Sequence, residues 1–109
     1  MSNWDVIKWI RRVYIYNGST VDISAYAANY MIYRIVINPI YGTQWKIQVG
    51  FTPGGSEVCG ETNISYLVTG KPISLRCNQV PAAGQNTLYF TMPIGNIYAD
   101  IQFVQYVGA

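Results

Sequence analysis

The stretch from Gln44 to Phe51, QWKIQVGF, alternates large apolar residues with polar residues or glycine. With a period of two, Trp45, Ile47, Val49 and Phe51 share one face of a strand and the residues between them share the other. This pattern is typical of a strand that buries one face in an antiparallel sheet.

The same alternation continues through most of the chain. It recurs in KPISLRCN (71–78), NTLYFTM (86–92) and NIYADIQFVQYV (96–107), with shorter candidates at 13–16, 20–24 and 63–69. Apart from Arg34, the segment 29–37 is apolar on both faces, which favours a central position. Turn compositions rich in Gly, Pro and Asn separate these segments, and none is long enough for a crossover helix. We predict an all-β fold, an antiparallel β-sandwich of jelly-roll or Ig-like type with about eight strands.

The first twelve residues, MSNWDVIKWIRR, follow a different pattern. At 100° per residue the apolar side chains fall on one arc and the three cations on the opposite one. Strict two-residue alternation would instead place Lys8 and Arg12 on the same face as Val6 and Ile10. We therefore predict a short amphipathic N-terminal helix over residues 1–12, followed by a single β-sandwich domain over residues 13–109.

The basic side of this N-terminal segment allows three interpretations. It contacts nucleic acid, or it lies at a membrane interface with tryptophan anchors, or its apolar side packs on a sheet and its cations face water. A basic arm on a β-sandwich resembles viral coat proteins, in which the arm faces the genome or a neighbouring subunit. Three cations are few for packaging a nucleic acid, so we favour a neighbouring subunit. The candidate arm contacts are Trp4, Lys8, Trp9, Arg11 and Arg12.

The composition restricts the function. Charged residues make up 11% of the chain, against roughly 25% in ordinary soluble domains, and the surface must instead be rich in Tyr, Asn, Gln, Ser and Thr. Such a surface suits contacts with other proteins. The formal charge of +2 does not indicate a general nucleic-acid binder, although it leaves a local basic patch open. The low charge fits either a protein exposed to harsh or acidic conditions outside the cell or one that is buried in an assembly.

The chain contains few of the residues that enzymes use for catalysis. The chain has no histidine, and its carboxylates are scattered apart from Glu57 and Glu61, which we expect to lie solvated in a Gly-rich turn. We predict no catalytic site, no metal site and no cofactor.

The two cysteines and two glycosylation sequons are typical of exported proteins. A bridge between Cys59 and Cys77 would add about 3 kcal/mol of stability, but it needs Cys59 in the facing sheet or in a loop that folds back. The alternative is that Cys77 is a small core residue. Asn17 and Asn63 begin N-x-S sequons, a pattern that also arises often by chance.

The outward face of the last predicted strand combines aromatic rings with an acid and an amide. Rings that stack and polar groups that orient hydroxyls suit a sugar, while tyrosine is also enriched at subunit interfaces. The third interpretation is an ordinary solvent-exposed face. The candidate residues are Tyr98, Asp100, Gln102 and Tyr106.

Neither a signal peptide nor a transmembrane helix is evident, because charges interrupt the apolar N-terminal residues and no window approaches about 20 apolar residues. We expect a virion or extracellular surface as the location. The favoured function is a structural assembly subunit of a virion, a capsid, coat or surface spike protein, whose partners are copies of itself or other coat subunits. The alternative is a secreted or cell-surface lectin-like module that binds a glycan.

Overall fold

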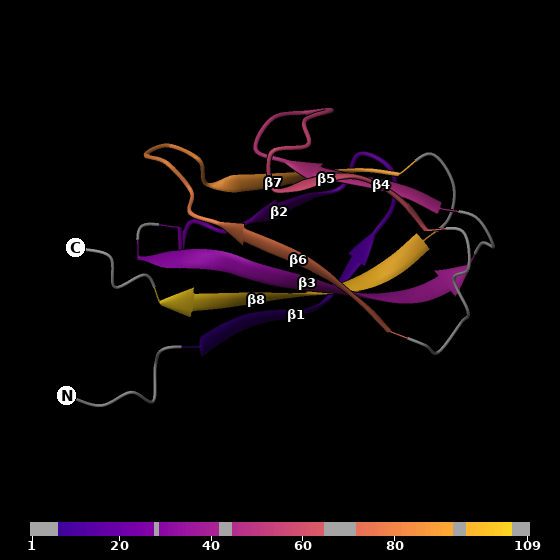
Figure 1. Cartoon of the computed structure of the whole chain (residues 1–109), viewed down its shortest axis with the longest axis horizontal. Helices are drawn as coiled ribbons and strands as arrows, with labels where there is room; N and C mark the ends of the chain where they lie inside the picture. The colour runs from indigo at the N-terminus through magenta and orange to yellow at the C-terminus, as the bar shows by residue number, and fades with distance from the viewer. Residues whose placement is uncertain (1–6, 28, 42–44, 65–71, 93–95, 106–109) are drawn as a thin grey trace.

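The computed structural model describes residues 7–27, 29–41, 45–64, 72–92 and 96–105, and these residues form eight strands and no helix. The strands are β1 (Ile7–Ile15), β2 (Thr20–Asp22), β3 (Tyr30–Tyr41), β4 (Trp45–Gly50), β5 (Cys59–Ile64), β6 (Ile73–Gln79), β7 (Thr87–Thr91) and β8 (Asn96–Gln105). They make two four-stranded sheets. The first sheet has the order β1-β8-β3-β6 and the second has the order β2-β7-β4-β5, and Figure 1 shows them as the lower and upper layers.

The antiparallel pairs are nested along the chain. β1 pairs with β8, β2 with β7, β3 with β6 and β4 with β5. The chain therefore runs as one long double-stranded ribbon that turns back between β4 and β5. Two further antiparallel pairs, β3 with β8 and β4 with β7, join successive sections of this ribbon into the two sheets.

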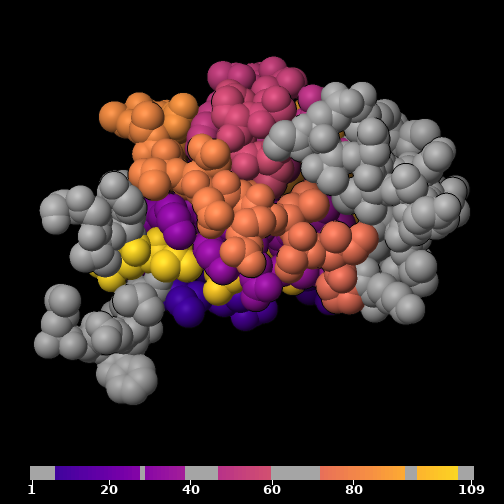
Figure 2. Space-filling view, in the orientation of Figure 1, coloured from indigo at the N-terminus to yellow at the C-terminus, as the bar shows by residue number. Residues whose placement is uncertain are grey.

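One apolar core fills the space between the sheets. Alternate residues of β7 and β8, among them Leu88, Phe90, Ile101 and Phe103, are almost fully buried and belong to a single cluster. Full burial of each such side chain is worth about 1.5 to 3 kcal/mol. In the space-filling view β6 and the loop that follows it, in orange, lie against the magenta β4–β5 segment (Figure 2). The sandwich-like all-β architecture predicted from the alternation is confirmed.

The predicted N-terminal helix is wrong over residues 7–12, which belong to β1; residues 1–6 lie outside the described residues. The physical reason is a β-bulge between Ile10 and Val13, where Arg12 has a φ of 56°. The bulge adds one residue, so Ile10 and Val13 both face the core and Arg12 stays outside. Lys8 does share the side of Ile10, at the margin of the sheet, where it is half-buried opposite Phe103.

Candidate functional site

All four arginines of the chain lie on the outer face of the first sheet, which we call the arginine face. They are Arg11 and Arg12 on β1, Arg34 on β3 and Arg76 on β6. Alternation places Arg34 and Arg76 outward, because their neighbours Ile35 and Cys77 are buried in the core. The bulge between Ile10 and Val13 leaves both Arg11 and Arg12 exposed. The strand order β1-β8-β3-β6 then brings these residues, distant in sequence, onto one surface.

Each guanidinium group of the arginine face lies over an aromatic ring. The distance from Cζ to the ring centroid is 4.3 Å for Arg11 over Trp9, 4.4 Å for Arg12 over Tyr98, 5.6 Å for Arg34 over Trp9 and 4.7 Å for Arg76 over Tyr33. Such contacts stabilise exposed cations by about 0.5 to 1 kcal/mol each. They hold the guanidinium groups along the sheet surface, where their N–H groups can meet a ligand.

Gln102 fixes the position of Arg34. Its side chain is only 7% exposed, and its Oε1 accepts a hydrogen bond of 2.5 Å from Nε of Arg34. A second hydrogen bond, of 3.3 Å, runs from Nη1 of Arg34 to Oγ of Ser74 on β6. A buried amide needs a hydrogen-bonding partner, so the side chains of Gln102 and Arg34 hold each other in place. Gln102 therefore positions an arginine instead of offering its own amide to a ligand.

Asp100 lies opposite the bulge in β1 and is the only carboxylate among the described residues of the arginine face. Its Oδ1 accepts a hydrogen bond of 2.7 Å from the main-chain N–H of Arg12, and its Oδ2 accepts one of 3.2 Å from Nδ2 of Asn38. Four guanidinium groups against one carboxylate leave three excess positive charges on this surface. The other carboxylates with described side chains, Asp22 and Glu57, lie on β2 and on the β4–β5 loop.

A polar cleft opens in the arginine face beside the bulge. Its volume is about 400 Å³, and its lining residues are Arg11, Arg12, Asn38, Tyr98 and Asp100. The ring of Tyr98 is covered by the guanidinium of Arg12, and its edge meets Tyr14 at a centroid distance of 5.7 Å. The cleft therefore offers charge and hydrogen bonds in place of an open ring.

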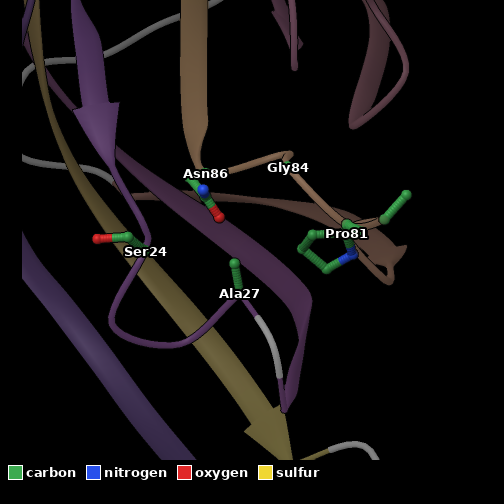
Figure 3. A pocket seen from close by; sticks show the side chains of 7 residues that line it. Ser24, Ala27, Pro81, Gly84 and Asn86 are labelled. Atoms are coloured by element: carbon green, nitrogen blue, oxygen red, sulfur yellow. The ribbon is translucent and has the colours of Figure 1, made fainter.

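A second hollow, of about 300 Å³, lies between the segment after β2 and the β6–β7 loop (Figure 3). Its lining residues are Ser24, Ala27, Pro81, Ala82, Ala83, Gly84 and Asn86. Figure 3 shows the side chains of Ala27 and Asn86 directed towards each other, while that of Ser24 points away. This hollow is lined by no titratable side chain, so it offers little with which to select a charged ligand.

The structure brings several of the predicted site residues together. Tyr98, Asp100 and Gln102 of the last strand share the arginine face with Trp9, Arg11 and Arg12 of the arm. Tyr106 and Trp4 lie outside the described residues. Arg34 and Arg76 were not predicted from the sequence as members of this site. Their outward direction was readable from the alternation, but their proximity to β1 depends on the strand order.

The two cysteines meet in the core, from opposite sheets. Cys59 on β5 and Cys77 on β6 are both buried thiols with their Sγ atoms 2.6 Å apart. The requirement that Cys59 lie in the facing sheet is met, while the disulfide itself stays a prediction. The hydrogen bond to Cys59, with burial as the second cause, raises the pKa of Cys77 far above its ordinary value. Cys77 is therefore unreactive as a nucleophile.

The sequon at Asn17 lies in the exposed turn between β1 and β2, where Oδ1 of Asn17 accepts a hydrogen bond of 3.1 Å from the main-chain N–H of Met92. The side chain of Asn63 is outside the described residues. Within the described part of the chain, no three Cys, Asp or Glu residues gather as a metal site would need. No helix in that part is long and apolar enough to cross a bilayer.

Comparison with known proteins gives no match. No family model, no curated protein and no solved structure is significantly similar to the chain.

Proposed function

We propose that the protein is a structural assembly subunit of a virion, a coat protein with a jelly-roll fold. The nested strand pairing is the observation that carries this proposal. A jelly roll consists of two packed sheets with eight strands in Greek-key connection, as a rolled double-stranded ribbon produces. In an Ig-like sandwich the first two strands share one sheet, whereas here β1 and β2 lie in different sheets.

Jelly rolls recur in viral capsid proteins and in lectins, so the fold alone does not choose between the two. The surface favours assembly. The predicted glycan site relied on the ring of Tyr98 for stacking, and that ring already has Arg12 over it and Tyr14 against its edge. The glycan-binding alternative therefore has less support than contacts between subunits.

The outer face of the second sheet has the chemistry of a subunit contact. Alternation turns Thr87, Tyr89 and Thr91 of β7 outward, and Gln48 of β4 lies beside Thr91. We call these four residues the uncharged face. Cores of protein interfaces are depleted in charged residues and enriched in tyrosine, which matches these four residues. Two carboxylates flank them: that of Asp22 on the edge strand β2 lies opposite Thr87, and that of Glu57 lies beside Gly50, the partner of Tyr89. We propose that copies of the protein, or other coat subunits, pack on the uncharged face, and that the protein leaves the cell with the particle.

Light scattering across a range of protein concentrations tests this proposal. We expect the mass to exceed 12.2 kDa and to rise with concentration. The larger mass should persist at acidic pH, because none of the four residues of the uncharged face carries a carboxylate. Thr91→Lys should restore the monomer, since a lysine at the centre of a subunit contact would have no partner. Ala83→Lys adds the same charge in the exposed β6–β7 turn and should leave the mass unchanged.

A monomer of 12.2 kDa at every concentration would contradict the proposal. Equal assembly of the Thr91→Lys variant and the wild type would show that the contact lies elsewhere. Circular dichroism of each variant distinguishes loss of assembly from loss of folding.

A further inference from the structure

The described charges are segregated between the two sheets. The arginine face carries three excess positive charges, while the described carboxylates other than Asp100 belong to elements of the second sheet. One surface is therefore strongly basic although the net charge of the whole chain is only +2. By charge complementarity, such a surface suits an extended polyanion.

The contacts that hold the four guanidinium groups leave N–H groups that can bind phosphate. The Cζ atom of each guanidinium lies 4.3 to 5.6 Å from the centroid of an aromatic ring, and Gln102 and Ser74 hold Arg34 in addition. The N–H groups that make no such hydrogen bond are left for a ligand. An arginine presents N–H groups in a rigid fork that matches two phosphate oxygens, and its plane stacks on nucleic-acid bases.

The shape of the face favours a single strand over a duplex. Four strands at about 4.8 Å spacing give a width of about 14 Å from β1 to β6. Among the described residues this face has no helix that could enter a groove. Tyr14 and Tyr16, which follow the bulge in β1, are 48% and 55% exposed. Such rings provide stacking surfaces for unpaired bases.

We propose that the arginine face binds single-stranded nucleic acid. The strand crosses β1, β8, β3 and β6, its phosphates contact the four arginines, and its bases stack beside Tyr14. This inference does not depend on assembly, because the uncharged face is on the other sheet.

Fluorescence anisotropy with labelled 20-nucleotide oligo(dT) and oligo(U), across a series of salt concentrations, tests the proposal. Four phosphate contacts predict a slope of about −2.8 for log K against log salt, since each contributes about −0.7 with single strands. Arg76→Gln should reduce the slope to about −2.1 and weaken binding about fivefold at 0.1 M salt. Ala83→Glu changes the net charge equally but lies off the arginine face, so it should weaken binding less than twofold.

A second variant separates stacking from charge. Tyr14→Ser should weaken binding severalfold while the salt slope stays unchanged, because a stacked base contributes no counterion release. Repeating the titration with Thr91→Lys shows whether binding survives without assembly, so failure of one proposal is distinguishable from failure of the other.

Three results would overturn the inference. The first is no binding at 50 mM salt, and the second is equal salt slopes for Arg76→Gln and the wild type. The third is equally tight binding of heparin or of a duplex of the same length, unaffected by Tyr14→Ser, which would assign the face to polyanions without regard to bases.

Discussion

The main-chain N–H of Arg12 donates a hydrogen bond of 2.7 Å to Oδ1 of Asp100, across 88 residues of sequence. Arg11 and Arg12 together lie opposite Asp100, because the register shifts between Ile10 and Val13. The extra residue of a bulge has no hydrogen-bonding partner in the β-ladder. Here the carboxylate of Asp100 accepts the hydrogen bond from the N–H of that residue. Through its second oxygen Asp100 also holds Asn38, so one side chain of β8 connects β1 with β3.

The first prediction concerns this carboxylate. Asp100→Ala removes both hydrogen bonds and should lower the free energy of unfolding by about 1 kcal/mol, since water can reach the exposed N–H of Arg12. Asp100→Asn keeps an acceptor for that N–H and should lose less than half as much. Urea unfolding followed by tryptophan fluorescence measures both values. Equal stability of the alanine variant and the wild type would show that the bulge needs no side-chain acceptor.

The bulge also explains where the sequence analysis succeeded and where it did not. In β7 and β8 the alternation was sufficient to predict a strand, because residues such as Leu88, Phe90 and Ile101 all lie on the side that faces the core. In β1 the alternation is broken at Arg12, so the same residues fitted a helix better than a strand. The partner that stabilises the bulge, Asp100, is remote in sequence, and local periodicity contains no information about it.

The arginine face was predictable in part for the same reason. The outward direction of Arg76 follows from its position between Leu75 and Cys77. Its place beside the rings and cations of β1 and β3 follows only from the strand order, which nested long-range pairing creates. Buried Gln102 was unpredictable as a support for Arg34, because its exposure depends on the side chain that covers it.

The second prediction concerns oxidation of the two thiols. Cys59 and Cys77 lie 18 residues apart in sequence and in contact across the sandwich. A disulfide between them would restrict the unfolded chain and raise the free energy of unfolding by roughly 3 kcal/mol. Urea unfolding with and without reductant, on protein whose oxidation state is verified by intact mass, measures the difference. Cys59→Ala is the control and should not respond to reductant. A bridged protein no more stable than the reduced one would indicate strain in the native state.

The third prediction is a loss of stability of the reduced protein at alkaline pH. The pKa of Cys77 is raised in the folded state above its ordinary value of 9.0, first by the hydrogen bond with Cys59 and then by burial. The unfolded chain therefore releases this proton first, and its contribution to stability is complete below pH 9.0 and falls as the pH rises. The slope approaches about 1.4 kcal/mol per pH unit.

Urea unfolding of the reduced protein at a series of pH values from neutral to alkaline tests this third prediction. Cys77→Ala and the oxidised protein lack the Cys77 thiol and should show a smaller alkaline decrease. Parallel curves for the reduced protein and Cys77→Ala would contradict it.

The fourth prediction concerns Gly50, the last residue of β4, where the β4–β5 loop folds back over the second sheet (Figure 1). A Cβ added to Gly50 would lie 2.5 Å from the carbonyl carbon of Gly55. Main-chain atoms cannot rotate away, and the loop is held by a 3.0 Å hydrogen bond from the N–H of Val58 to the carbonyl of Val49. Gly50→Ala should therefore displace the loop and cost about 1 to 3 kcal/mol.

Gly84 is the control for Gly50, because a Cβ there meets nothing within 4 Å although its φ is +86°. Gly84→Ala should cost about 1 kcal/mol through its backbone conformation alone, and Gly84→Asn should cost less because asparagine tolerates the left-handed region. Limited proteolysis separates the two causes. Cleavage within residues 52–57 should become faster in Gly50→Ala and stay at the wild-type rate in Gly84→Ala. An unchanged rate in both variants would mean that the loop accommodates a methyl group without leaving the sheet.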